Sequence, residues 1–104
     1  CIQDPWYSLG TGNLLSVAEM AVHVCQMTGQ AEIDACFDMV TAGGAKTLNL
    51  GDAYGIEVGK PANLGVLEAR SRYEAILERA TARWVISKGD VLVETVPAKV
   101  KWQG

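Results

Sequence analysis

The chain has 104 residues, of which 49% are hydrophobic, and its formal net charge is −3. This length allows one small domain with a modest core, and the composition is typical of an ordered globular chain rather than a disordered one. The mildly acidic balance, without a cluster of lysines and arginines, argues against nucleic acid as a partner. No apolar run reaches the roughly 18 residues that a membrane-spanning helix needs, so we expect no membrane association.

The beginning of the chain is predicted to be a loop, because Pro5, Gly10 and Gly12 interrupt it. Asn13 is a suitable N-cap for a helix that follows. Residues 14–27 are predicted to form that helix, and apolar side chains cover nearly its whole circumference. A surface helix would carry only an apolar stripe. We therefore expect protein to surround this helix on most sides.

Two further helices are predicted in the first half of the chain. Residues 31–41 are typical of an amphipathic helix, since their large apolar residues recur at helical spacing. These residues are Ile33, Cys36, Phe37 and Val40. Gly43 and Gly44 should end this helix, and residues 45–50 should form a short third one.

After about residue 55 the pattern changes to strands. The expected elements are a strand at 62–67, a helix at 70–80, and strands at 83–87, 91–96 and 100–102. The stretch Lys88-Gly89-Asp90 predicts a hairpin turn between the second and third of these strands. The chain thus divides into residues 1–54, which are mainly helical, and residues 55–104, a small β unit with one inserted helix.

Three cysteines and one histidine are the usual metal-binding or nucleophilic candidates in this sequence. Cys25 and Cys36 lie among apolar residues, so we expect small buried side chains in a reducing compartment, the cytoplasm. His23 is two residues from Cys25, a spacing that points the two side chains apart on a helix, so no zinc site is expected. His23 is interpreted as a surface or packing residue, because no carboxylate partner marks it as a general base.

Several stretches carry a resemblance to a known family when they are taken together. They are DPWYSLGTGN (4–13), HVCQM (23–27), TAGGAKTLNL (41–50), YGIEVGKPANL (54–64) and VISKGDVLVET (85–95). Together they resemble the C-terminal end of the amidohydrolase superfamily, and most closely its cytosine deaminase branch. YGIEVGKPANL is moderately specific, because many members share a G-x-I-x-x-G-K-x-A-[DN] pattern. DPWYSLGTGN discriminates better, since it is similar to the loop after the last barrel strand of cytosine deaminases; isopropylammelide-type aminohydrolases are the nearest cousins.

The resemblance implies an α/β fold in two incomplete parts. Residues 1–54 would form the terminal loop and helices of a metal-dependent-hydrolase TIM-like barrel, and residues 55–104 part of its flanking small β-sandwich domain. The last barrel strand of the family ends in a His-Asp pair, so the metal-binding Asp is expected just before Cys1. We therefore expect a C-terminal fragment that has no catalytic or metal-ligating residue of its own and is inactive by itself.

For the full-length parent, the resemblance implies a hydrolase that deaminates a free pyrimidine or a related ring, acting on a C–N bond that is not a peptide bond. A divalent metal, Fe²⁺ or Zn²⁺, is also implied, because a metal lowers the pKa of its bound water and so supplies hydroxide at neutral pH. The implied partner is a cytosine-like small molecule, and the implied assembly is a cytoplasmic homo-oligomer. The alternative is a free-standing, non-catalytic α+β interaction module.

Trp6 and Cys1 are the candidates for residues close to the substrate. A planar aromatic at the mouth of a barrel could stack on a flat ring, although by spacing alone Trp6 would more often anchor its loop. Relatives often carry an acidic residue at the position of Cys1, which leaves the identity of the ring open. Asp4 precedes a proline and is interpreted as a turn residue. Asn63 stands where most amidohydrolases have Asp, and the cytosine deaminase branch shares this Asn.

Overall fold

The structure is a computed structural model that describes residue 3, residues 5–6 and residues 8–103. The helices are α1 (Leu14–Val24), α2 (Gln30–Val40), α3 (Ala42–Thr47) and α4 (Arg72–Leu77), with a 3-10 helix, η1 (Gly51–Ala53), after α3. The strands are β1 (Leu64–Leu67), β2 (Ala82–Ser87) and β3 (Asp90–Glu94). This order confirms the prediction of three helices followed by a β unit with one inserted helix. No helix in the described part of the chain is long and apolar enough to cross a membrane.

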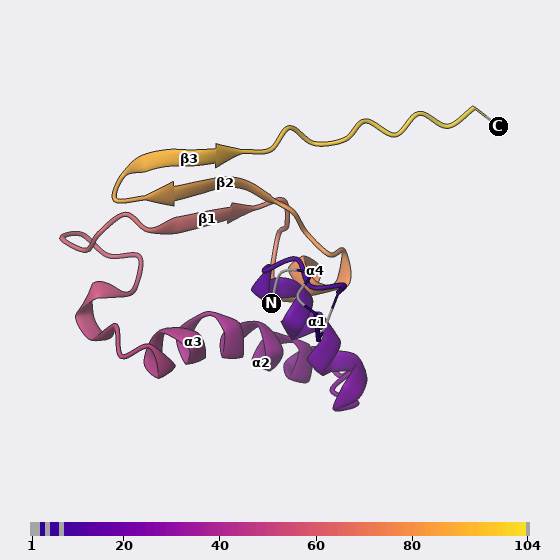
Figure 1. Ribbon diagram of the computed structural model, residues 1–104, viewed down its shortest axis with the longest axis horizontal. Coiled ribbons are helices and arrows are strands. Elements are labelled where there is room, and N and C mark those ends of the chain that lie inside the picture. Colours follow the sequence, from indigo (N-terminus) through magenta and orange to yellow (C-terminus); the bar gives the residue numbers. More distant parts are fainter. Residues whose placement is uncertain (1–2, 4, 7, 104) are drawn as a thin grey trace.

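The three strands form an antiparallel sheet in the order β1-β2-β3. In Figure 1 this sheet stands above the helices, with β1 the strand nearest to them. Ser87 pairs with Asp90, which leaves Lys88 and Gly89 as a two-residue turn with φ angles of 50° and 84°. Two consecutive positive φ angles are what the type I′ hairpin turn requires. The predicted hairpin is therefore confirmed.

The hydrophobic core lies between α1, α2 and α4. Its buried side chains are Ala18, Val22, Ile33, Cys36 and Ile76. Two residues come from α1 and two from α2, at the spacing that places them on one face of each helix. α4 belongs to the second half of the chain, yet Ile76 completes the core of the first half. The inserted helix therefore connects the β unit to the helices.

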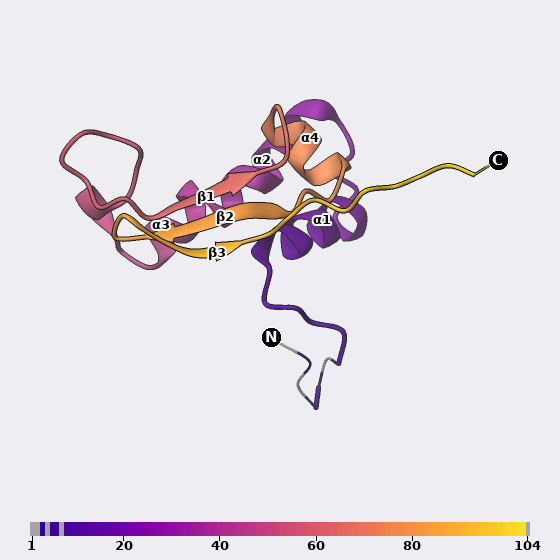
Figure 2. The same cartoon turned by 90° about the horizontal axis from the view of Figure 1, so that it is seen from above.

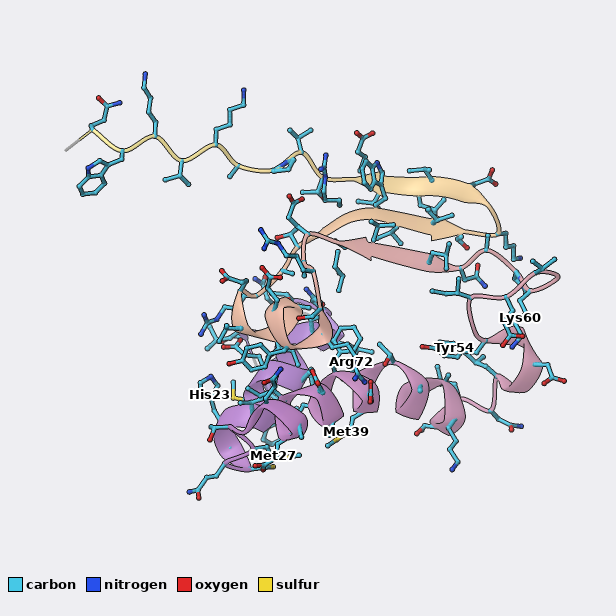
Figure 3. The ribbon with its side chains drawn as sticks, turned by 180° about the vertical axis from the view of Figure 1, so that it is seen from behind. His23, Met27, Met39, Tyr54, Lys60 and Arg72 are labelled. Carbon is cyan, nitrogen blue, oxygen red and sulfur yellow. The ribbon has the colours of Figure 1, made fainter. Side chains whose placement is uncertain are left out.

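An ion pair holds α4 against α2 at the edge of this core. Arg72 on α4 donates to both carboxylate oxygens of Asp38 on α2, each at 2.8 Å, and lies 3.8 Å from Asp34 (Figure 3). The hydrogen bond with Asp38, and then the charges of Asp38 and Asp34, raise the pKa of Arg72 above its already high ordinary value. An arginine guanidinium is charged whatever its partner, and this exposed ion pair contributes modestly to holding α4 against α2.

Several expectations from the sequence are wrong in detail, and the first is the helix predicted at 14–27, which ends at Val24. Cys25 is exposed rather than buried, because α1 ends at Val24 and Cys25 lies in the turn that follows. Gly43 and Gly44 do not end α2 but lie inside α3. The interruption is at Thr41 instead, whose hydroxyl donates to the carbonyl of Phe37 at 3.0 Å.

The remaining two errors concern the second half of the chain. The helix predicted at 70–80 is shorter, because Ser71 caps its start and Arg79, with a φ of 49°, ends it. Residues 100–102 are extended but are not part of the sheet. Backbone pairing partners for these residues are absent from the described part of the chain.

Candidate functional site

Trp6 lies on the loop that precedes α1, and its side chain is 98% exposed. The backbone N–H of Gln3 donates to the carbonyl of Gly10 at 2.9 Å, which brings the two ends of this loop together. Figure 2 shows the loop extending from the start of α1 on the side opposite α2 and α4. The loop therefore displays an aromatic side chain that the described part of the chain does not bury. Cys1 and Asp4 lie outside the described residues.

The end of the loop is fixed to α1 by its own polar side chains. Gly12 has a φ of 78°, which favours glycine, and it reverses the chain just before the helix. Asn13 accepts a hydrogen bond from the backbone N–H of Leu15 at 3.0 Å, which confirms it as the N-cap. The Ser16 hydroxyl donates to the carbonyl of Asn13 at 2.6 Å. The Gly-Thr-Gly-Asn run thus ties the end of the loop to the first turn of α1.

Helix α1 carries a stripe of exposed apolar side chains next to this loop. We call this the α1 stripe; it consists of Leu14, Val17, Met20 and Val24, which are 57%, 56%, 52% and 70% exposed. The opposite side of the helix buries Ala18 and Val22 in the core. As the sequence predicts, α1 has more apolar surface than the described chain covers. Such a patch is typical of a surface that contacts other protein.

His23 has a carboxylate neighbour that the sequence analysis did not assign. Its Nε2 lies 3.3 Å from Oε1 of Glu19, one turn earlier on α1. The same oxygen is 2.8 Å from Nη2 of Arg79, which follows α4. The Glu-x-x-x-His spacing was the signal that could have revealed this pair. The pair lies on an open surface, so His23 is a surface histidine, as predicted.

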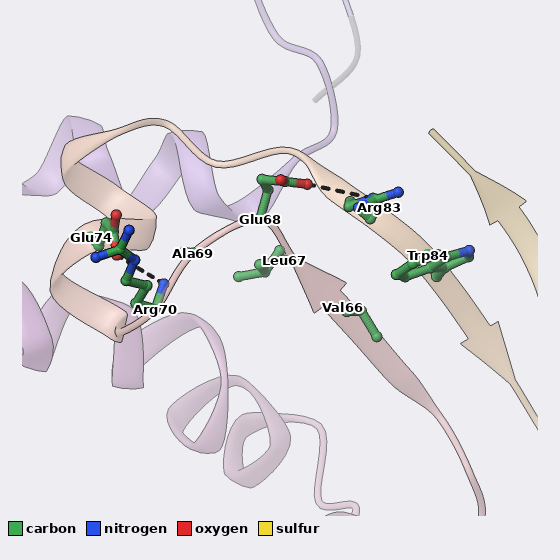
Figure 4. Close-up of a pocket in the computed structure, with 8 residues that line it drawn as sticks. All are labelled: Val66, Leu67, Glu68, Ala69, Arg70, Glu74, Arg83 and Trp84. Atoms are coloured by element: carbon green, nitrogen blue, oxygen red, sulfur yellow. Dashed lines mark hydrogen bonds and ion pairs between the residues drawn. The ribbon is translucent and has the colours of Figure 1, made fainter. Parts of the chain in front are cut away.

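Figure 4 shows a shallow hollow of about 460 Å³ beside β1, β2 and α4. Its lining residues are Val66, Leu67, Glu68, Ala69, Arg70, Glu74, Arg83 and Trp84. Within it, Arg83 Nε lies 3.4 Å from Glu68, and the backbone N–H of Arg70 donates to Glu74 at 2.9 Å. The Arg83 guanidinium also lies over the Trp84 ring, 4.6 Å from its centre. Two arginines and two glutamates line the hollow, so their formal charges sum to zero and net charge does not favour an anion or a cation there.

The buried thiol of Cys36 does not have the properties of a nucleophile. It is 1% exposed, and its Sγ lies 3.7 Å from the sulfur of Met27. Burial raises the pKa of this thiol above 9.0, and the charges of Cys25 and Glu32 act in the same direction. A thiol becomes reactive as the thiolate, which these surroundings disfavour. Cys36 is therefore a core residue, as the sequence predicts.

The segment that carries the YGIEVGKPANL pattern is held by two of its own polar side chains. Lys60 donates to the carbonyl of Tyr54 at 2.9 Å, and Figure 3 shows these two residues side by side. Gly55 has a φ of 128°, and a Cβ there would lie 3.2 Å from the Lys60 ammonium. Asn63 accepts a hydrogen bond from the backbone N–H of Lys88 at 2.8 Å, which ties the segment to the β2–β3 turn. The pattern therefore has a structural explanation in this chain.

A metal site requires several ligands that converge on one point. Within residues 3–103, leaving out residues 4 and 7, no three His, Cys, Asp or Glu side chains gather closely enough to hold a metal ion. A catalytic zinc site, for example, uses three protein ligands and an open position. The described residues thus do not fit a catalytic metal.

Comparisons with known proteins give the chain its context. The model of the family described as "Amidohydrolase family" matches residues 1–93. A curated relative, the N-isopropylammelide isopropyl amidohydrolase of Pseudomonas sp. (strain ADP), is 32% identical over 93 residues, which are 89% of this chain and 23% of the relative.

Solved structures are also similar to this chain. The structure of 5-methylcytosine deaminase from Klebsiella pneumoniae, liganded with 5-fluorocytosine, matches this chain with a TM-score of 0.89 and 40% sequence identity. The match covers 97% of this chain and 24% of the deaminase chain. The same enzyme liganded with phosphonocytosine has a TM-score of 0.88 at 40% identity, with coverages of 97% and 24%. The chain thus spans about a quarter of the length of the relatives it matches.

Proposed function

The chain belongs to the amidohydrolase family, and from this premise we propose that it is the C-terminal quarter of a hydrolytic deaminase acting on a cytosine-like ring. The observation that carries the proposal is the similarity to 5-methylcytosine deaminase, at 40% identity and a TM-score of 0.89 over 97% of the chain. The other relative is also a hydrolase of C–N bonds, and its lower identity of 32% favours the cytosine-like ring.

In this proposal the two halves of the chain have different places in the full-length protein. Residues 1–54 form the terminal loop and helices of a TIM-like barrel, and residues 55–104 form part of a flanking β-sandwich. The α1 stripe packs against the remainder of the barrel, because burying a large aliphatic side chain contributes about 1.5–3 kcal/mol. The full-length protein would assemble as a homo-oligomer.

The loop before α1 is proposed to lie at the mouth of the active site. Trp6, 98% exposed here, would supply a flat face against the ring of the substrate. Cys1 would be close to the substrate, directly after the metal-binding Asp. The amidohydrolase family is generally metal-dependent, and we propose that Fe²⁺ or Zn²⁺ is held entirely by residues that precede this chain. The 104 residues alone would then be inactive.

A free-standing, non-catalytic interaction module remains the alternative. It would account for the exposed α1 stripe as a docking surface. It would not account for 40% identity with an enzyme over nearly the whole chain. We therefore favour the enzyme.

The test is an ammonia-release assay on the full-length protein, with cytosine and 5-methylcytosine offered separately. We expect ammonia from at least one ring, loss of turnover with a chelator, and recovery when Fe²⁺ or Zn²⁺ is restored. The 104-residue chain, assayed alongside with the same metals, should release none. Release of an alkylamine from an N-alkylated aminotriazine, with no ammonia from either pyrimidine, would overturn the proposed substrate.

A further inference from the structure

Arg79 follows the end of α4 and holds a backbone conformation that favours glycine. Its φ is 49°, and the N–H of Ala80 reaches back to the carbonyl of Ala75 at 2.9 Å, so Arg79 occupies the left-handed position of a Schellman-type helix end. Glycine takes this position without steric cost, whereas a larger residue is disfavoured there. The Arg79 side chain is 69% exposed, so packing in the core does not account for an arginine at this point.

The guanidinium of Arg79 has its partner on a different helix. Its Nη2 lies 2.8 Å from Oε1 of Glu19, a side chain in the middle of α1 that is only 23% exposed. The ion pair joins the end of α4, in the second half of the chain, to a helix of the first half. A disfavoured backbone conformation is kept where the surrounding structure requires it, and an observed one supports a hypothesis of function. The bond to Glu19 is the feature that an arginine supplies here and a glycine would not.

This ion pair spans a gap in the packing of the two helices. A cavity of about 110 Å³ lies between the start of α1 and the end of α4, and Glu19 and Arg79 both form part of its wall. Asn13 and Ser16, at the N-cap and in the first turn of α1, line it as well. Because this space is not filled by side chains, packing alone does not fix the distance between the first turn of α1 and α4. The bond between Glu19 and Arg79 supplies that constraint.

The first turn of α1 also holds the end of the loop that carries Trp6. Asn13 accepts a hydrogen bond from the backbone N–H of Leu15 at 3.0 Å, and the Ser16 hydroxyl donates to the carbonyl of Asn13 at 2.6 Å. A shift of this turn relative to α4 would therefore move the end of the loop with it. The constraint on α1 is thus also a constraint on the loop.

We propose that Arg79 is a positioning residue for the substrate, which acts through Glu19 on the first turn of α1 and so on the loop that carries Trp6. The inference rests on the proposed function, which places Trp6 against the substrate ring. Arg79 itself touches no substrate in this arrangement. Its loss weakens the binding of the ring in the ground state and in the transition state alike, because it changes where the loop lies and not the groups that carry out the hydrolysis.

Substitution by glycine separates this role from a purely stabilising one. Arg79→Gly removes an exposed ion pair but relieves the backbone, so the Tm of the full-length protein should stay equal or rise. The KM for the deaminated pyrimidine should nevertheless rise by about 3-fold to 10-fold, with kcat within about 2-fold of the unmodified enzyme.

Gln26→Gly is the matched control for this variant. Gln26 follows α1 with a φ of 54°, and its side chain makes no hydrogen bond or ion pair within the described part of the chain. Its replacement relieves the same kind of backbone and should leave KM unchanged. An equal rise of KM in both variants would overturn the proposal, and so would a lower Tm with unchanged KM for Arg79→Gly.

Amide hydrogen exchange tests the positioning without turnover. In the full-length protein, Arg79→Gly should speed exchange of the Leu15 and Ser16 amides, which both bond to Asn13, by about 3-fold or more. Arg79→Lys keeps a cation near Glu19 and should recover most of the protection and of the KM. Unchanged exchange of these amides in Arg79→Gly would overturn the inference. If the unmodified protein released no ammonia from either pyrimidine, the proposed function would fail, while these exchange rates would still report whether Arg79 positions α1.

Discussion

The helical layer and the sheet of this molecule both carry large apolar residues but are covered very differently. α1, α2 and α4 pack on one another, and every residue of the buried core cluster lies on one of them. The sheet makes few contacts with the helices, and all five residues of β3 are exposed. Val91, Leu92 and Val93 on that strand are 58%, 65% and 48% exposed.

The contrast separates what the chain can stabilise by itself from what needs other protein. The helical core requires only residues of this chain, including the inserted helix α4. The sheet has backbone hydrogen bonds between its strands, but the described part of the chain does not cover the apolar side chains of β3. In the proposed full-length protein, the remaining part of the polypeptide would cover β3, and this would account for the contrast.

The largest expected effect is on the helical core. Ile76, 4% exposed, joins α4 to α1 and α2, and Ile76→Ala should lower the free energy of unfolding by about 2–5 kcal/mol. The matched control is Val93→Ala on β3. In the 104-residue chain we expect this change to cost less than about 0.5 kcal/mol, as for a surface position. Urea unfolding, monitored by circular dichroism, measures both.

The same two substitutions in the full-length protein sharpen the comparison. Ile76→Ala should cost as much as before, whereas Val93→Ala should now cost more than about 1 kcal/mol, because other protein covers the strand. If Val93→Ala lowered the free energy of unfolding equally in the 104-residue chain and in the full-length protein, β3 would be uncovered in both. That result would contradict the proposed difference between the sheet and the helical core.

The next prediction concerns the exposed loop. Trp6→Ala in the full-length protein should lower kcat/KM by about 10-fold to 1000-fold, which corresponds to about 1.4–4 kcal/mol of lost transition-state stabilisation. Trp6→Phe should recover part of the loss, because it keeps a flat face. Metal content should not change. If Trp6 were instead a buried anchor, the Ala variant would lose about 3–5 kcal/mol of stability with activity intact at low temperature. Tm and kcat/KM on one preparation distinguish the two.

The ends of the helices show where sequence patterns stop being informative. α1, α3 and α4 are each followed by a non-glycine residue with positive φ, namely Gln26, Asn49 and Arg79. After α1, the N–H of Met27 reaches back to the carbonyl of Val22 at 2.9 Å, a closing bond of the Schellman type. Glycine usually takes this position, so helices that end without it are predicted too long. This explains why the helices predicted at 14–27 and 70–80 are longer than α1 and α4.

The candidate site was predictable in its local features but not in its long-range ones. Asn13 as a cap and the surplus apolar surface of α1 follow from neighbouring residues. The bond from Arg72 to Asp38 joins residues 34 apart, and the bond between Asn63 and Lys88 joins residues 25 apart. No local pattern pairs such residues. The roles of Trp6 and Cys1 depend on protein outside this chain, and they stay predictions.

A smaller effect on stability at high pH should come from Cys36, which is buried in the helical core. The pKa of Cys36 is raised above 9.0 in the folded protein, so between 9.0 and that raised value the unfolded chain binds fewer protons. Stability should therefore be unaffected by this thiol below pH 9.0 and fall above it, by up to about 1.4 kcal/mol per pH unit. Cys36→Ala should remove this decline, whereas Cys25→Ser should only lessen it, because burial is the largest cause of the raised pKa and the charge of Cys25 a smaller one. A decline in urea titrations as steep with Cys36→Ala as in the unmodified protein would contradict the assignment.

The smallest expected effect lies at the water-exposed turn of the sheet. The side-chain oxygen of Asn63 accepts a hydrogen bond from the N–H of Lys88 at 2.8 Å, and both residues are exposed. Asn63→Ala removes the acceptor, but water can replace it, so we expect a loss of only about 0.5–1.5 kcal/mol. Asn63→Asp keeps an acceptor at the same place and should be within about 0.5 kcal/mol of the unmodified protein. Urea unfolding gives the stabilities, and hydrogen exchange at Lys88 reports the bond itself. A loss with Asp as large as with Ala would contradict the role of the Asn63 side-chain oxygen as the acceptor that stabilises this turn.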